Sequence, residues 1–302
     1  MDFELHSEAT TMRVYHSVFV RRDIGEPIFR SLGIDEVPGD QDFIWFDVKE
    51  GDPKWALVAE AIRQYRETRK PLFGTGARPL VEDRVWTKFS ETDRSRAEFL
   101  EMVPLSHHGY PQPEKDLGYL RETYDLSNAC KQCWAGSRQK ASFRMTGEPK
   151  WGKHSILQLN WEFEEYFVSS LAYEQVFEKH GVPFRTVLSH SDGRVLSNVV
   201  QLVVDDTVSV ETKDLSSSQC PVCGVRSFSV CGRGARPAPV ATVLPMFKSE
   251  QYFDSYRRRV FVSRLLYGAI KAMNLKGADF LPCASPLLSP GLDRGVRPNA
   301  TP

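Results

Sequence analysis

The chain has no net charge and no long apolar run, and these two absences argue against nucleic-acid-binding and membrane proteins. Its 302 residues include 39 Lys and Arg against 39 Asp and Glu, so no overall field favours binding to nucleic acid or an anionic membrane. No segment approaches the roughly 20 apolar residues that span a bilayer. The acidic start, residues 1–4, is unlike a secretory signal. With 41% apolar residues for a core, we expect a soluble, cytoplasmic protein.

The sequence also lacks a recognisable catalytic motif. No phosphate loop or Ser/His/Asp constellation stands out, and the turn at residues 74–76 lacks the third glycine of a dinucleotide-binding loop. The adjacent His107 and His108 are expected to point apart as exposed polar residues rather than to act as a metal ligand or a base. The acidic run at residues 162–165 is typical of a solvated strand end. We therefore expect a binding protein, with an enzyme left open only in the N-terminal part.

Cysteine is scarce, but four of the six cysteines form two Cys-x-x-Cys pairs, Cys130/Cys133 and Cys220/Cys223. Four thiolates satisfy a zinc ion without any other ligand, so paired units of this kind are typical of closed structural sites. The spacing therefore predicts one Zn²⁺ site with these four ligands. A redox pair, reduced thiols or a disulfide are the alternatives. Cys231 and Cys283 have no matching partners and are expected to be buried free thiols.

Each cysteine pair opens a stretch that reads as a copy of the other. Phe167-Val168-Ser169 and Phe261-Val262-Ser263 follow the pairs, with apolar residues at matching offsets of +2, +4 and +7 from the serine. Each serine is a good N-cap and predicts a helix of about three turns. Gly181 and Gly277 are expected to end the helices in the left-handed conformation. Two such modules would bring their cysteines together about a pseudo-twofold axis.

The expected fold is α+β. Strands are predicted at 14–20, 43–48, 85–89 and 99–105, with a helix starting at Asp52-Pro53, and the alternation of Leu157, Leu159, Trp161 and Phe163 predicts a half-buried strand. The predicted organisation is an N-terminal domain at 1–115, ending in a linker at 106–115, then a duplicated zinc-binding domain at 116–283 and a disordered tail at 284–302. The two modules of the zinc-binding domain, 116–190 and 191–283, are joined by a β meander.

These motifs resemble those of a known family. The residues that carry the resemblance are Cys220-Pro221-Val222-Cys223-Gly224, the imperfect copy Cys130-Lys131-Gln132-Cys133-Trp134-Ala135-Gly136, and Leu275-Lys276-Gly277-Ala278-Asp279-Phe280-Leu281-Pro282. They are similar to the double-CxxCG-motif proteins that occur as paralogues in myxobacteria, although the first pair lacks the immediate glycine. The resemblance implies a metal-binding cytoplasmic protein, and some relatives act as immunity proteins that neutralise a toxin delivered by neighbouring cells.

Two functions follow as hypotheses. The leading one is a zinc-stabilised binding protein whose partner is another protein, such as a cognate toxin. The alternative is a nucleic-acid-associated zinc-ribbon protein that uses Arg257, Arg258 and Arg259, which have aromatic residues nearby. Because the matching position in the first module is acidic, a basic surface of one module facing an acidic surface of the other accounts for the arginines equally well. Electrostatic docking of a protein partner is a third reading.

Overall fold

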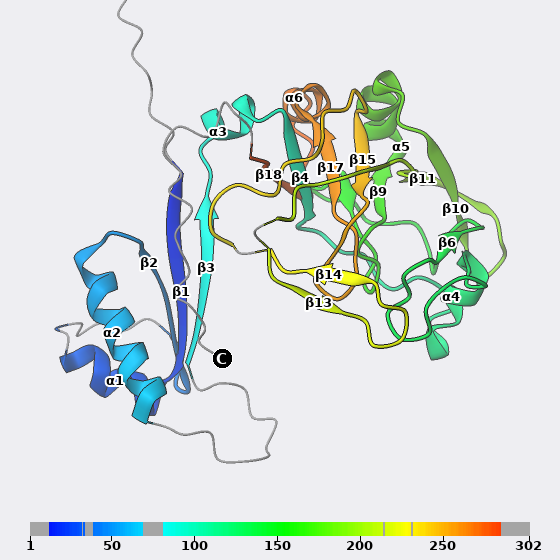
Figure 1. Ribbon diagram of the computed structural model, residues 1–302. Coiled ribbons are helices and arrows are strands. Elements are labelled where there is room, and N and C mark those ends of the chain that lie inside the picture. Colours follow the sequence, from blue (N-terminus) through cyan, green and yellow to red (C-terminus); the bar gives the residue numbers. More distant parts are fainter. Residues whose placement is uncertain are drawn as a thin grey trace, which may run out of the picture. The chain divides into compact units, whose positions relative to one another are not determined.

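The computed structural model describes residues 12–31, 33, 39–68, 81–213, 215–230 and 232–284. These residues form two compact units (Figure 1). The first unit ends at Ser90 and takes in residues 232–234, and the second unit comprises the other described residues. The fold is mixed α+β, rich in strands and with few helices. None of the described helices combines the length and the apolar character that crossing a bilayer requires.

The first unit is a three-stranded antiparallel sheet with two helices. Its elements are β1 (Arg13–Arg21), α1 (Arg22–Ser31), β2 (Phe43–Lys49), α2 (Pro53–Thr68) and β3 (Val81–Lys88), and the strand order is β2-β1-β3. Val18, Val20 and Ile44 of the sheet form a core with Phe29 of α1 and with Val58 and Ile62 of α2. The helices therefore bury the apolar face of the sheet.

The predicted strands at 14–20, 43–48 and 85–89 are confirmed, and α2 begins at Pro53 as expected, where Lys54 N donates to Asp52 Oδ1 at 2.9 Å. The sequence does not predict helix α1, because its glycine and proline favour turns. Gly25 has a packing role in it, since a Cβ there would lie 2.6 Å from Val20 Cγ1. The predicted turn at 74–76 lies outside the described residues.

The second unit contains two five-stranded sheets. The first sheet has the order β7-β10-β11-β9-β8, and the second has the order β12-β15-β17-β4-β18. The helical elements are α3 (Glu91–Arg96), η1 (Lys115–Leu117), α4 (Gly118–Thr123), α5 (Ser170–Ala172), η2 (Tyr173–Phe177), η3 (Glu178–His180) and α6 (Arg264–Ala272). The strands are β4 (Phe99–Pro104), β5 (Tyr124–Asp125), β6 (Arg138–Gln139), β7 (Arg144–Met145), β8 (Ile156–Leu157), β9 (Tyr166–Ser169), β10 (Phe184–Ser189), β11 (Val195–Leu202), β12 (Thr207–Val208), β13 (Ser217–Gln219), β14 (Arg226–Phe228), β15 (Met246–Ser249), β16 (Tyr252–Phe253), β17 (Val260–Ser263) and β18 (Ala278–Pro282).

Four strands of each sheet are arranged in the same way. In the first sheet the order β8-β9-β11-β10 is antiparallel throughout, and β15-β17-β4-β18 repeats it in the second. Strands β9 and β17 each end at the predicted capping serine. Ala172 N donates to Ser169 Oγ at 3.2 Å, and Leu266 N donates to Ser263 Oγ at 3.3 Å. The two N-cap predictions are therefore confirmed.

The helices that follow these serines also pack alike. Tyr173 lies against Phe184 with ring centroids 4.8 Å apart, and Tyr267 lies against Phe280 at 5.2 Å, both tilted by 55°. The largest apolar core of the unit takes residues from both sheets and both helical segments, among them Val168, Phe177, Val262 and Ile270. The two sheets therefore share one apolar core.

Three sequence predictions for this unit are wrong. The domain boundary does not fall at 115, since β4 pairs with β17 and β18, and the predicted linker is packed, with Gln112 N donating to Arg144 O at 2.9 Å. The meander breaks after β11, because β12 pairs with β15 of the second sheet. The helical spacing of Leu266, Ile270 and Met273 predicts that all three share one buried face, but Met273 follows the last residue of α6 and is 45% exposed.

A fourth prediction, the strand from Leu157 to Phe163, is also wrong. Only Ile156–Leu157 is a strand, and the chain then forms a loop in which Trp161 has a positive φ of 69°. Trp161 and Phe163 are 39% and 55% exposed. The alternation of apolar residues therefore reflects an aromatic loop surface rather than a half-buried strand. The predicted tail lies outside the described residues, except for Ala284.

The two glycines predicted to end the helices differ in their surroundings. Gly181 ends its helix at φ 71° with open space around it, as predicted. After α6 the left-handed residue is Asn274, and Gly277 follows at φ 117°, where a Cβ would lie 1.8 Å from Ile156 O. Gly277 therefore permits the close approach of two backbone segments, in which Ile156 N donates to Lys276 O at 3.0 Å.

We predict that Gly277→Ala lowers the free energy of unfolding far more than Gly181→Ala. The second substitution costs about 1 kcal/mol for a left-handed alanine, whereas the first forces two backbones apart and should cost several kcal/mol. Equilibrium denaturation of both variants measures the difference. Equal losses would show that the approach of Gly277 to Ile156 is not constrained.

Candidate metal centre

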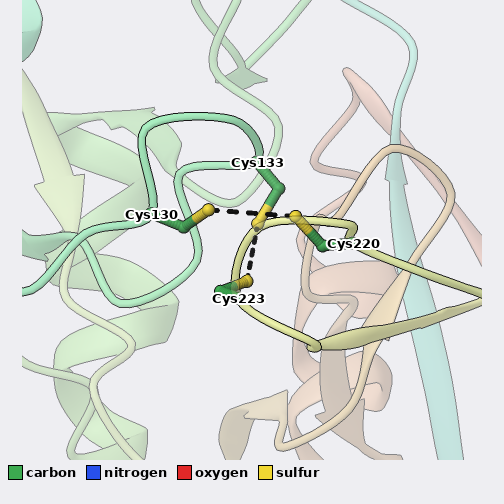
Figure 2. A group of neighbouring side chains, drawn as sticks. All are labelled: Cys130, Cys133, Cys220 and Cys223. Atoms are coloured by element: carbon green, nitrogen blue, oxygen red, sulfur yellow. Dashed lines mark hydrogen bonds between the residues drawn. The ribbon is translucent and has the colours of Figure 1, made fainter.

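The four predicted cysteines come together between two loops (Figure 2). The sulfur atoms of Cys130 and Cys220 lie 3.8 Å apart, those of Cys133 and Cys223 lie 3.5 Å apart, and all four lie within 4.8 Å of one another. A tetrahedral ion with metal–sulfur bonds of about 2.3 Å separates its sulfurs by about 3.8 Å. The four cysteines are free thiols, and their spacing fits a single metal ion.

Each cysteine pair sits in the same hydrogen-bonded turn. In the first turn, residues 130–135, Cys130 N donates to Ala135 O and Trp134 N donates to Cys130 O, both at 2.9 Å. In the second turn, residues 220–225, Cys220 N donates to Val225 O and Gly224 N donates to Cys220 O, again at 2.9 Å. These bonds fold the chain tightly enough for two sulfurs two residues apart to face one ion.

Trp134 and Gly224 occupy the same position of the two turns. Both have positive φ angles, 61° and 75°, a conformation that glycine adopts without cost and other residues adopt at about 1–2 kcal/mol. The missing glycine of the first motif therefore does not change the turn, and Trp134 bears the strain instead. Such strain persists only where the surrounding structure fixes the conformation.

The centre is largely shielded from water. Cys130, Cys133 and Cys220 are buried beside Ala135, with Val225, Tyr252 and Tyr256 packed against them, and Cys223 is exposed. Backbone N–H groups of Cys133 and Gln132 lower the pKa of Cys130 to about 6, whereas burial raises the pKa of Cys133 to about 12. The turn thus stabilises one thiolate of the first pair by itself, and a bound cation would be needed to hold the second.

The remaining candidate ligands do not join the centre. Among the described residues, the four cysteines form the only group of three or more His, Cys, Asp and Glu side chains close enough to hold an ion. His107 and His108 are not part of it, and burial lowers the pKa of His108. Cys283 is buried elsewhere, and Cys231 lies outside the described residues.

The acidic and basic runs of the sequence lie against each other. Arg258 N donates to Glu164 Oε1 at 2.8 Å, and the guanidinium of Arg257 lies 5.1 Å from the ring centre of Phe163. Arg259 forms ion pairs with Glu101, at 2.7 Å, and with Asp254. The basic run, residues 257–259, thus contacts the acidic run, residues 162–165, through a backbone hydrogen bond and a ring contact.

A buried polar network connects the two sheets. Lys248 Nζ of β15 donates to Glu165 Oε1 at 2.6 Å, and Gln201 Nε2 of β11 donates to Glu165 Oε2 at 2.9 Å. Glu165, Lys248 and Gln201 are all buried. The prediction of a solvated acidic run is therefore wrong for Glu165, and equally for Glu162, which is 7% exposed and accepts a hydrogen bond from Tyr124 at 2.7 Å.

No protein-family model matches the chain, and no curated protein matches it closely enough to count as a relative.

We predict that the protein binds about one metal ion per chain and that Cys220→Ser abolishes this binding. Because metal binding and folding are coupled, the variant should also lose several kcal/mol of unfolding free energy. Elemental analysis and denaturation measure the two effects. Cys283→Ser is the matched control, since it removes a buried thiol outside the centre and should keep the ion.

We also predict that Glu162 makes the protein less stable as the pH rises. Burial raises the pKa of Glu162 to about 7, above the unfolded value of about 4.3. Because the folded protein holds the proton of Glu162 more tightly than the unfolded chain does, the free energy of unfolding falls as the pH rises from the lower pKa to the upper one, by about 4 kcal/mol in total. Glu162→Gln should remove this loss, measured by denaturation between pH 5 and pH 8.

Glu174→Gln changes an exposed carboxyl in the same way and serves as the control. A wild type whose pH dependence matches that of Glu162→Gln would contradict the raised pKa.

Proposed function

We propose that the chain is a zinc-stabilised binding protein that recognises another protein. The observation that carries the proposal is the convergence of four cysteine sulfurs from two matching turns. Four thiolates complete the coordination of Zn²⁺ and leave no open position for a substrate or an attacking water, so a centre of this composition serves structure rather than catalysis. Tetrahedral four-sulfur sets suit zinc or iron, and zinc needs no redox chemistry to fill this role.

The two halves of the second unit, in this proposal, derive from one duplicated module. Support comes from the shared antiparallel strand order, the equivalent serine caps, the tilted Tyr–Phe pairs and the identical hydrogen bonds of the two turns. Each half contributes one turn with two cysteines, and a metal ion bound by both turns joins the two halves. The unit becomes a rigid scaffold.

The motif resemblance to double-CxxCG-motif proteins supplies the class of partner, a toxin that the cytoplasmic protein neutralises. A rigid scaffold suits this role, because a partner that is bound by a preorganised surface costs less conformational entropy on association. The nucleic-acid alternative has less support, since Arg259 is paired with Glu101 and Asp254, and the total charge of the chain is zero.

The test is co-expression with the polypeptides encoded beside the gene for this chain. We expect one of them to arrest growth when it is expressed alone and to be neutralised by this protein through direct binding, measured with the two purified proteins. The Cys220→Ser variant should lose protection because the scaffold loses its ion, and Cys283→Ser should keep it.

The opposite result is that none of the neighbouring polypeptides is toxic or bound. Affinity for DNA or RNA that falls steeply with salt would instead support the alternative function. If the purified protein retains zinc but binds no protein, the structural role of the ion would stand and the proposed protein partner would not.

A further inference from the structure

The second unit has a pocket of about 370 Å³ that lies apart from the cysteine centre. Strand β4 contributes Glu101 to Pro104, the loop after β8 contributes Gln158 and Phe163, and the segment before β17 contributes the three arginines, 257–259. The walls of the pocket thus come from both sheets. The pocket lies where the acidic run, residues 162–165, meets the basic run, residues 257–259.

Three buried donor atoms around this pocket have no hydrogen-bond partner. They are Nε2 of Gln158, Nε of Arg257 and Nε of Arg258, and the Gln158 side chain belongs to a residue that is only 1% exposed. A buried donor without an acceptor costs about 1–3 kcal/mol, so such atoms are usually satisfied by water or by a ligand. Their grouping around one pocket points to a ligand rich in acceptor atoms.

The charges around the pocket favour an anionic ligand. Its two carboxylates are already engaged, because Glu101 pairs with Arg236 and Arg259, and Asp254 pairs with Arg259. Arg257 stacks over Phe163, and Arg258 stacks over Tyr252 and donates to its hydroxyl at 3.2 Å. Within the described part of the chain, neither of these two guanidinium groups donates a hydrogen bond to a carboxylate, so both keep donors for one.

Exposed apolar side chains adjoin the pocket. Phe163, which lines it, is 55% exposed, and Leu105, next to the lining residue Pro104, is 65% exposed. Trp161, two residues before Phe163 in the chain, is 39% exposed, and its ring lies 4.4 Å from that of Tyr110 between centroids. Arginine and aromatic residues contribute strongly to the energy of protein–protein interfaces, and the exposed ring of Phe163 and the three arginines line this pocket.

We propose that this pocket receives an acidic side chain of a partner protein, with the neighbouring aromatic residues contacting an apolar residue beside it. The inference rests on the proposed function, protein recognition, and assigns the surface that performs it. Arg257 and Arg258 supply the positive charge, and the buried side chain of Gln158 supplies a neutral donor in the lining of the site. Charge-assisted hydrogen bonds of this kind are about twice as strong as neutral ones.

The test is selection of a library of short random peptides against the full-length protein in its zinc-bound form. We expect the enriched peptides to carry Asp or Glu next to an aromatic or aliphatic residue. Replacement of that acid by Asn or Gln should weaken binding about tenfold or more. Arg257→Met and Gln158→Leu, which keep the side-chain volume, should weaken binding of the acidic peptide by a similar factor.

Arg226→Met is the matched control, because Arg226 also lies over a phenylalanine ring, that of Phe228 at 5.8 Å, but does not line the pocket. It should leave binding unchanged, and thermal melting confirms that the variants are folded. Enriched peptides that bind all variants equally would overturn the pocket assignment and leave protein recognition standing. Enrichment without acidic residues, no enrichment, or equal binding of free glutarate would also overturn the proposal.

Discussion

The second unit brings two cysteine turns that are distant in the sequence close enough together to hold one metal ion. Residues 134–219 separate the pairs, yet the four sulfurs lie within 4.8 Å. Thiolates so close together repel one another, and an ion that binds all four removes this repulsion. The ion can do so only if the rest of the unit already holds the turns in register, so the centre requires both halves to be folded and joined.

The topology provides that connection. Strand β4 precedes the first cysteine pair but lies between β17 and β18 of the second sheet, and β11, between the pairs, completes the first sheet (Figure 1). Strand β4 is followed in the chain by the turn at residues 130–135, and β11 by the turn at residues 220–225. Each of these two strands pairs in the sheet whose other long strands follow the other turn in the chain. Neither half can then complete its sheet alone, and the shared apolar core follows from the same exchange. This arrangement favours cooperative folding of the unit.

Local signals in the sequence predicted the centre and the caps well, because each is decided by a few neighbouring residues. The spacing of Cys130, Cys133, Cys220 and Cys223 and the position of Ser169 and Ser263 are signals of this kind. The exchange of β4 could not be predicted, since strand pairing is a long-range choice that local pattern does not encode. The apolar alternation from Leu157 to Phe163 misled for a related reason, since a loop that buries Leu159 and exposes Trp161 and Phe163 has the same sequence pattern as a strand.

The contact between the halves combines apolar and charged parts that act differently. Burial of the Glu165–Lys248 pair adds little net stability, because desolvation of the two ions offsets their attraction, but an unpaired charge left by a shifted register would cost several kcal/mol. The pair therefore disfavours alternative alignments of the sheets more than it strengthens the native one. A fixed alignment is also what holds Arg257 over Phe163 and sets the donors of the pocket, since these residues come from opposite halves. The recognition surface that we infer thus depends on the same register that brings the four sulfurs together.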